Sequence, residues 1–497
     1  MNKQPLRYFF FSPINSYDTY EADNYANMQV ARNIYGTLVS DLIDGVPQGV
    51  IAETWDVSSD GKVWKFKIRK NITFEDGSQI TPEIVLMNFK RILWLTQKEG
   101  LVLNSLLPEV QSWKSMNEES KSIFINEQKE LLFKFVHRPV SLLEAISQPI
   151  YGIAHPSCFD KDGKWKNVMS TISSGQYRIS ERSENSIHLI SRNMYQSVDS
   201  SPQSAVIYWP TTKEDSVINA LKSNRADLIV DHGLSLSKSM LSEFKQTGIE
   251  FSQEPPLRMH FVELNYKKKA FSSLKDRQEF RDIFLSKFSS NTKLFNTDIT
   301  VDASFIPKGG VGYQKINIPH QMSIKNKKLS RGSLDVLLYP YFSNPELQKA
   351  LDESILGTLE IMGFKPNIFR YETRLNAMKR VREGDFDLVA RGSGIFVKNP
   401  FGDLRMMFMS RVGARIPDSS GKIPNLITQA ELEQNPEVRA KIATKINESI
   451  FNDASAITFA HSGFVFIHRG NVDLSRYNVF ADPLELRAVG WLPHEKK

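Results

Sequence analysis

Residues 35–93 read YGTLVSDLIDGVPQGVIAETWDVSSDGKVWKFKIRKNITFEDGSQITPEIVLMNFKRIL. A hairpin, a second turn and the start of a helix follow one another in this stretch. Gly61 can adopt the positive φ that a tight hairpin requires. Residues 63–68 nearly alternate apolar and basic side chains, which is typical of a strand with one buried face. Thr81 is a predicted N-cap, and Pro82 takes the first helical position, where a missing N–H costs nothing.

The composition predicts a folded protein of two or three domains, because the chain has 497 residues and 41% hydrophobic content. No apolar run approaches the roughly 18 residues that a membrane span needs. The net charge of +7 is spread along the chain among 56 acidic residues, which argues against nucleic-acid binding. Cys158 is the single cysteine, so no internal disulfide forms, and we expect its thiol to be inert because no His or Asp motif lies near it.

The second half of the chain alternates predicted strands with predicted helices. A short apolar strand at residues 334–339 precedes Asn344 and Pro345, an N-cap and first-turn pair, and Gly363 can end the helix that follows. Residues 385–390 predict the next strand, and Asn435-Pro436 opens another helix. This alternation is typical of α/β layers.

Taken together, these segments resemble the family 5 extracellular solute-binding proteins, the peptide- and nickel-binding receptors of bacterial ABC importers. The resemblance rests first on residues 52–83, with their hairpin, turn and helix start in fixed order. Three later segments resemble the same family, and the likeness extends from about Leu6 to Leu492. These segments are 170–195 (STISSGQYRISERSENSIHLISRNMY), 260–284 (HFVELNYKKKAFSSLKDRQEFRDIF) and 304–313 (SFIPKGGVGY).

The resemblance implies an α/β fold with three lobes, similar to type II periplasmic binding proteins with an extra domain. Lobe I would comprise residues 1–45, 166–255 and 466–497. Lobe II, the extra domain, would be residues 46–165, and lobe III residues 256–465. Two chain crossings between lobes I and III would form a hinge, with the ligand cleft between these lobes.

The function that the resemblance implies is capture of a small solute by hinge closure and its delivery to a membrane-embedded ABC importer permease. A peptide or peptide-like compound is the leading candidate ligand, and a monomer without cofactor is expected. The N-terminal sequence MNKQPLRYFFFSPINS is not a signal peptide, so we expect a mature, periplasmic form with an added Met1. A lipid-anchored extracellular protein is the alternative.

Catalytic and metal motifs are missing from the sequence. There is no G-x-S-x-G nucleophile elbow, no H-E-x-x-H and no pair of C-x-x-C clusters. We therefore expect no enzyme, and a hydrolase with a dispersed site is the competing hypothesis. His461 and His468 are seven residues apart, and strand periodicity would place them on opposite faces, so no metal site is predicted.

The most informative departure from the family lies at residues 391–400, RGSGIFVKNP. Family members read GWGADYPDP here, with an Asp that pairs with the α-ammonium of a bound peptide. Phe396 replaces that Asp and Ser393 replaces the Trp. An unpaired ammonium in a closed cleft costs several kcal/mol. We therefore expect simple peptides with a free amine to bind poorly.

The charged residues at and near residues 391–400 leave alternative predictions for the ligand open. Arg391 and Lys398 would favour a carboxylate or phosphate. The ligand would then be a non-peptide compound, such as an anionic opine, a sugar phosphate or a metal chelate. Alternatively, Asp403 takes over the ammonium, or Arg391 and Lys398 point to solvent.

The other candidate ligand contacts follow from the resemblance alone. They are Asn15, Ser16 and Tyr17 in the loop after the first strand, Ser174 and Gly175 in a glycine turn, Asn265 and Tyr266 at a strand end, Tyr339, and Gly394.

Overall fold

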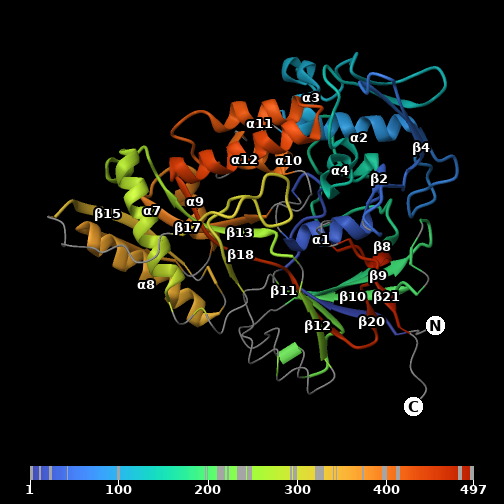
Figure 1. Cartoon of the computed structure of the whole chain (residues 1–497). Coiled ribbons are helices and arrows are strands. Elements are labelled where there is room, and N and C mark those ends of the chain that lie inside the picture. Colours follow the sequence, from blue (N-terminus) through green and yellow to red (C-terminus); the bar gives the residue numbers. More distant parts are fainter. Residues whose placement is uncertain are drawn as a thin grey trace. The chain divides into compact units, whose positions relative to one another are not determined.

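The computed structural model describes most of the chain (Figure 1). The described residues are 4–10, 13–21, 25–41, 43–97, 101–195, 197–198, 200–209, 219–220, 223–231, 242, 249–253, 255–291, 294, 299–318, 330–339, 341–342, 344–371, 374–394, 400–409, 415–478 and 484–492.

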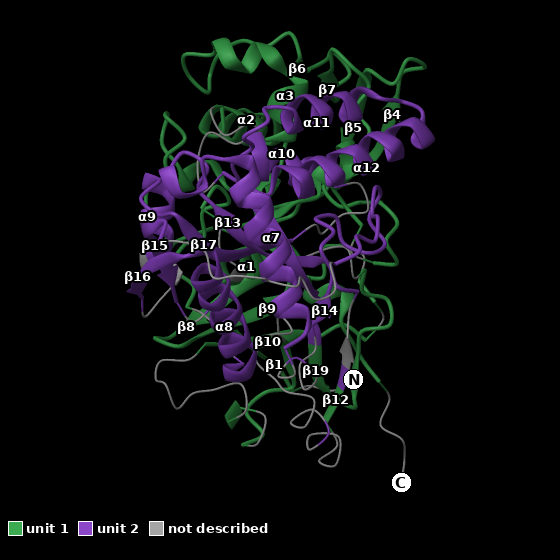
Figure 2. Ribbon diagram, turned by 60° about the vertical axis from the view of Figure 1, so that its left-hand side comes forward, with its two compact units in different colours: residues 1–230, 248–250, 466–497 green, residues 231–247, 251–465 purple. Residues whose placement is uncertain are grey.

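The chain forms two compact units, which Figure 2 colours separately. Unit 1 comprises residues 1–230, 248–250 and 466–497, and unit 2 comprises residues 231–247 and 251–465. The three predicted lobes stay a prediction. The division into units ends unit 2 at Val465. It joins most residues predicted as lobe I with those of lobe II in unit 1, but assigns residues 231–247 and 251–255 of the predicted lobe I to unit 2.

Within the described residues, a seven-stranded sheet is the centre of unit 1. Strand β1 pairs in parallel with β10 and β11, whereas β10 pairs with β9, and β9 with β8, in antiparallel fashion. Strand β12, at one edge, and its neighbour β19 contain points where the chain passes between the units. The order is β12 (Ile249–Gln253), β19 (Val465–Arg469), β11 (Leu228–Asp231), β1 (Leu6–Phe9), β10 (Ser204–Tyr208), β9 (Ser186–Ser191) and β8 (Tyr177–Arg182).

The predicted hairpin of residues 35–93 supplies two strands of a second sheet of unit 1. The described strands of this sheet run in the order β4 (Ala52–Val57), β5 (Val63–Ile68), β7 (Leu131–Lys134) and β6 (Ile123–Ile125). Gly61 has a φ of 71°, as the predicted hairpin requires. Helix α2 (Pro82–Leu95) begins as predicted, because Thr81 caps it by accepting a hydrogen bond from the backbone N–H of Ile84. Its apolar face packs on this sheet.

A buried ion pair connects residues 46–165 with the first 45 residues within unit 1. Arg91 on α2 donates to both carboxylate oxygens of Asp18 at 2.7 and 2.8 Å, and its guanidinium is fully buried. The same side chain donates to the carbonyl of Gly163 and lies over the rings of Phe159 and Trp165. A buried charge that keeps all of these partners resists separation of the segments that supply them.

The remaining described elements of unit 1 are short, apart from the ten-residue helix α1. They are α1 (Tyr25–Ile34), α3 (Val102–Leu106), α4 (Leu142–Ile146), β2 (Val39–Ser40), β3 (Gln48–Gly49), β20 (Val472–Asp473), β21 (Gly490–Trp491) and the 3-10 turns at Pro108–Ser112, Pro149–Tyr151, Pro156–Cys158 and Leu486–Ala488.

Unit 2 is built on a six-stranded sheet, as far as its described strands go. Strand β17 pairs in parallel with β15, and β15 with β16, whereas β13 runs antiparallel to both β17 and β18. The order is β14 (Thr300–Val301), β18 (Ala456–Ser462), β13 (Arg258–Leu264), β17 (Leu388–Gly394), β15 (Gly332–Leu338) and β16 (Phe364–Arg370).

Helices cover both faces of this sheet. Helices α7 (Leu274–Ser289) and α8 (Pro345–Met362) share one apolar cluster with β13, β15, β17 and β18. On the other face, α9 (Arg374–Glu383) packs on β15 and β17. Helices α10 (Phe401–Met409), α11 (Ile423–Leu432) and α12 (Pro436–Asp453) pack on β13 and β18. A 3-10 turn at Lys269–Phe271 precedes α7.

Helix ends follow the predicted capping chemistry. Asn344 accepts from two backbone N–H groups at the start of α8, and Asn435 does so for α12. Gly363 ends α8 with a φ of 81°. Asn224 has a φ of 58°, in the left-handed region that Asn tolerates better than most residues.

Two predictions about reactive side chains can be compared with the structure. Cys158 is buried, and burial raises the pKa of its thiol, in line with an inert cysteine. His461 and His468 do not share a strand, so the prediction from strand periodicity is wrong: His461 lies on β18 and His468 on β19, in different sheets.

The described part of the chain contains no group of three or more His, Cys, Asp or Glu side chains arranged to hold a metal ion. Nor does any helix in that part combine the length and apolar character needed to cross a membrane.

The cap at Asn344 is testable by substitution. Replacing Asn344 with Ala removes an acceptor for two N–H groups, so the free energy of unfolding in urea should fall by about 1 kcal/mol. The Asn344→Asp variant keeps the acceptor and should stay within a few tenths of the wild-type value. Equal losses in both variants would contradict a capping role.

Candidate functional site

The carboxyl ends of three parallel strands meet at one edge of the six-stranded sheet. Strands β15, β16 and β17 end there, and the antiparallel neighbours bring the start of β13 and the end of β18 to the same edge, because Arg258 pairs with both Gly394 and Ser462. Open α/β sheets bind ligands outside the carboxyl ends of their strands. We call this region the unit 2 edge, and it is the candidate site of that unit.

A hydrogen-bonded chain of three side chains lies at the unit 2 edge. His260 on β13 is fully buried. Its Nδ1 lies 2.6 Å from the hydroxyl of Tyr341, which follows β15, and its Nε2 lies 2.9 Å from the Ser462 hydroxyl at the end of β18. These contacts join three segments that lie far apart in the sequence.

Gly392 makes room for this chain. A Cβ atom at Gly392 would lie 2.1 Å from the Tyr341 hydroxyl and 3.2 Å from Nδ1 of His260. No real Cβ tolerates the shorter distance, so a side chain at position 392 would displace Tyr341. The first glycine of the segment Gly392-Ser393-Gly394 therefore has a packing reason.

An ion pair is buried on the opposite face of the same strands. Arg391 on β17 is opposite Phe261 on β13, and its Nε lies 2.5 Å from a carboxylate oxygen of Glu263, two residues further along β13. The two side chains are 8% and 3% exposed, and the guanidinium also lies over the ring of Phe261.

This pair corrects one expectation for Arg391, that its side chain points to solvent, whereas its assignment as a ligand contact stays a prediction. The side chain does not point to solvent, and it is not an uncompensated cation, because Glu263 supplies the opposite charge. Burial raises the pKa of Glu263 to about 7, against the opposing effect of Arg391. The pair is thus held in an environment that penalises the ionised carboxylate.

Three predicted contacts of unit 2 have partners within the fold. The buried Tyr339 donates its hydroxyl proton to the carbonyl of Ala390 at 2.8 Å. The amide of Asn265 donates to the carbonyls of Gly384 and Phe386 at 3.1 and 2.9 Å. The Tyr266 ring lies 5.9 Å from the guanidinium of Arg277. Their assignment as ligand contacts stays a prediction.

The segment that departs from the family pattern is only partly described. Ser393 and Gly394 are the last residues of β17 and lie at the unit 2 edge, opposite Met259 and Arg258. Asp403 lies in the first turn of α10. Phe396 and Lys398 fall outside the described residues.

Unit 1 has a comparable edge at the carboxyl end of β1. In the loop that follows, Asn15 exchanges two hydrogen bonds with Asn27 of α1, and the hydroxyl of Ser16 accepts from the N–H of Asp18. Tyr17 is buried, and its hydroxyl accepts a hydrogen bond of 2.8 Å from Arg182. Burial raises the pKa of Tyr17, and the Arg182 cation opposes this shift.

The predicted glycine turn of unit 1 is a packing site. Ser174 is fully buried, and its hydroxyl accepts from the N–H of Gly36 and donates to the carbonyl of Ile153. A Cβ at Gly175 would lie 2.5–2.7 Å from backbone atoms of residues 33–35, at the end of α1. The structure thus gives both residues a role in holding α1.

The comparison with protein families identifies the group to which this chain belongs. A model described as bacterial extracellular solute-binding proteins, family 5 Middle, matches residues 46–414. The chain is a family 5 solute-binding protein.

Individual relatives are distant. The periplasmic oligopeptide-binding protein OppA of Salmonella typhimurium is 20% identical over 307 residues, which cover 57% of this chain and 54% of OppA. This match thus spans about half the length of that curated relative.

Solved structures are similar over almost the whole chain. DppA from Helicobacter pylori in complex with the peptide STSA has a TM-score of 0.79 at 17% identity, and the match covers 99% of this chain and 98% of DppA. AgaA from A. tumefaciens R10 in complex with agropinic acid has a TM-score of 0.78 at 16% identity, with 99% of each chain covered. The predicted periplasmic-binding-protein-like α/β fold is confirmed by these structures.

Sequence reasoning on this family 5 protein missed His260, Glu263 and Tyr341. His260 and Glu263 left a signal, because they lie among the apolar residues that follow Arg258 in RMHFVEL (258–264). Tyr341 left a weaker signal in the sequence. Tyr339 continues the alternation of β15 and joins the same apolar cluster as Leu337. Tyr341, two residues after Tyr339, is the partly exposed tyrosine of this segment.

The raised pKa of Glu263 predicts how the stability of this family 5 protein depends on pH. The folded-state pKa of about 7 lies above the unfolded value of about 4.3, so the native state binds more protons between these pH values. The free energy of unfolding should therefore fall as pH rises from 5 to 8, by on the order of 3 kcal/mol from this group. Urea unfolding at several pH values measures this.

The Glu263→Gln variant isolates the contribution. It cannot titrate, so its free energy of unfolding should lack that part of the pH dependence. Glu83→Gln is the matched control, since Glu83 pairs with Lys129 on the surface. Identical pH profiles for wild type and Glu263→Gln would contradict the assignment.

The close packing at Gly175 gives a second test. Gly175→Ala places a methyl group against the backbone of α1, so the free energy of unfolding should fall by about 1–3 kcal/mol or more. Gly470→Ala is the comparison, because the added methyl would meet only the movable carboxylate of Glu250. A smaller loss for Gly175→Ala than for Gly470→Ala would count against this packing role.

Proposed function

We propose that this family 5 protein captures a peptide or peptide-like solute and delivers it, unaltered, to a membrane-embedded ABC importer. Family membership, together with a polar strand edge at the carboxyl ends of parallel strands, supports this proposal most directly. Two relatives support a peptide as the ligand, because OppA is an oligopeptide-binding protein and the DppA structure contains a peptide.

The ligand class follows from the charge at the unit 2 edge. The anionic alternative relied on Arg391 and Lys398. Glu263 lies beside Arg391 as a counter-charge, and Lys398 falls outside the described residues. The other groups described there include the Tyr341 ring and Ser393, which are neutral, and Arg258, which is a cation. Neutral hydroxyl and aromatic groups suit peptide backbone and uncharged side chains better than a phosphate.

Binding without turnover is part of the proposal. His260 and Ser462 form a Ser–His hydrogen bond of the kind that a hydrolase would use, yet they are 0% and 1% exposed. A nucleophile must reach its substrate, and this hydroxyl is enclosed by the sheet. The pair therefore supports a structural role over the competing hydrolase hypothesis.

Location and mechanism complete the proposal. We place the protein in the periplasm, by analogy with the periplasmic relatives, where it acts as a monomer. Ligand binding favours a closed conformer by hinge motion, provided that the ligand binds this conformer more tightly than the open one.

The proposal predicts an intact peptide in the purified protein. Mass spectrometry after denaturation should identify a released peptide, and incubation with synthetic Ser-Thr-Ser-Ala should leave that peptide uncleaved. Small-angle scattering should show a more compact protein at saturation with the identified peptide. Release of agropinic-acid-like compounds, peptide cleavage, or unchanged scattering would each contradict one part of the proposal.

A further inference from the structure

We propose that Tyr341 is a ligand-contact residue and that His260 positions its ring. The inference rests on the proposed function and assigns a specificity-determining residue to it. The residue predicted for this role from the sequence, Tyr339, is buried, whereas Tyr341 is partly exposed.

Tyr341 is packed against its neighbours and is partly exposed. It packs against both apolar clusters that meet at the end of β15. Its centroid lies 4.6 Å from that of Phe342, 5.7 Å from that of His260 and 5.8 Å from that of Tyr339. The exposed part of the ring therefore belongs to a side chain that its neighbours hold in place.

His260 fixes the hydroxyl end of the ring. A neutral imidazole donates from one nitrogen and accepts at the other, and the hydroxyl groups of Tyr341 and Ser462 can each do either. Both contacts are thus satisfied in either tautomer. The Ser462 contact in turn fixes the orientation of the buried imidazole.

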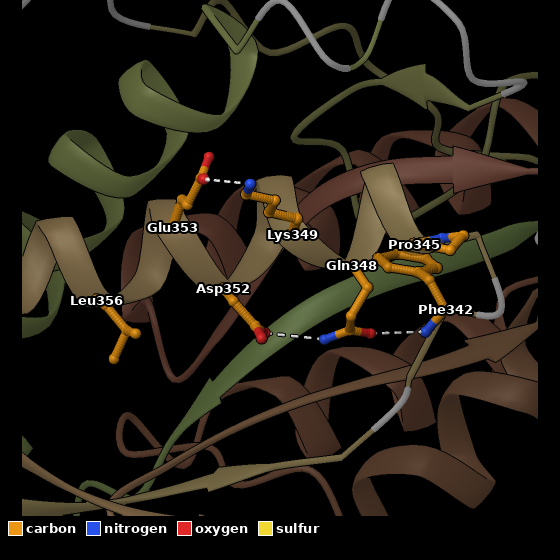
Figure 3. Close-up of a pocket in the computed structure, with 7 residues that line it drawn as sticks. All are labelled: Phe342, Pro345, Gln348, Lys349, Asp352, Glu353 and Leu356. Carbon is orange, nitrogen blue, oxygen red and sulfur yellow. Dashed lines mark hydrogen bonds and ion pairs between the residues drawn. The ribbon is translucent and has the colours of Figure 1, made fainter.

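The residue after Tyr341 is held from helix α8. Gln348 accepts a hydrogen bond from the N–H of Phe342 at 2.9 Å and donates to Asp352 at 2.8 Å, as Figure 3 shows. These residues line an open groove of about 480 Å³ along α8, to which Phe342 contributes its ring. Asp352 is half-buried there, and burial raises its pKa.

These contacts make Tyr341 a pre-organised side chain. Ordering a mobile side chain on binding costs free energy, and a ring that is already fixed avoids most of that cost. An exposed tyrosine face binds apolar groups and peptide planes without requiring charge. Tyr341 would therefore favour an uncharged part of the ligand.

Affinity measurements on two tyrosines test the contact. The probe is a synthetic mixture of tri- and tetrapeptides, including Ser-Thr-Ser-Ala, measured by native mass spectrometry and then by calorimetry with the best binder. Tyr341→Leu should weaken binding at least tenfold. Tyr313→Leu is the control, because Tyr313 is another partly exposed tyrosine of unit 2 whose hydroxyl is hydrogen-bonded, to Asp302; it should stay within twofold.

Two substitutions of His260 test positioning. Asn can replace the Nδ1 contact with Tyr341, whereas Gln can replace the Nε2 contact with Ser462. We expect the His260→Asn variant to keep most of the peptide affinity, and the His260→Gln variant to lose about as much affinity as Tyr341→Phe. The two His260 variants should have similar thermal stability. A purely structural role would instead lower stability in both variants without separating their affinities.

The possible failures are distinguishable. A wild-type protein that binds no member of the peptide mixture removes the proposed function and this inference together. Wild-type binding with Tyr341→Leu and Tyr341→Phe both folded and within twofold removes the inference alone. If Tyr341→Leu does not fold, Tyr341→Phe together with the two His260 variants decides the outcome.

Discussion

Strand β13 has to accommodate two ionisable side chains inside a sheet that is covered on both faces. Glu263 and His260 alternate with apolar residues of two different clusters, so each points into a different layer of packed helices. A buried carboxylate without a counter-charge, or a buried imidazole without hydrogen-bond partners, would cost several kcal/mol. The neighbouring strands supply what is missing: Arg391 from β17 on one face, and Tyr341 and Ser462 on the other. The arrangement of the unit 2 edge follows from this requirement.

Local chemistry made much of the fold predictable. Thr81, Asn344 and Asn435 cap helices as predicted, and Gly61 and Gly363 have the positive φ that their turns need. These features depend on residues adjacent in the sequence. The ion pair of Arg391 could not be predicted in the same way, because its partner lies 128 positions earlier and is selected by the pairing of β13 with β17. The same holds for His260 and Tyr341, which lie on separate segments.

The ion pair of Arg391 and Glu263 also changes how the difference from the family sequence pattern at residues 391–400 is interpreted. The sequence alone indicates that Arg391 and Lys398 reverse the local charge in favour of an anionic ligand. In the structure the charge of Arg391 is compensated, so the loss of the family Asp at Phe396 is not accompanied by a gain of positive charge at position 391. Neutral groups such as the Tyr341 ring and Ser393 discriminate ligands by shape and hydrogen bonding, with the desolvation of unpaired polar groups as the main penalty for a wrong ligand.

The Tyr341–His260–Ser462 chain has a second consequence, because of where its strands continue. Strand β13 follows β12 along the chain, and β18 precedes β19, and both β12 and β19 contain passages from one unit to the other. Ser462 is three residues before the passage at Val465. A ligand that shifts Tyr341 therefore acts on side chains of the two strands that lead into the passages. Such a shift alters the equilibrium between conformers only if the ligand binds them with different affinity. The hydrogen-bonded chain supplies a contiguous physical connection between the proposed ligand contact and the segments that hinge motion would have to bend.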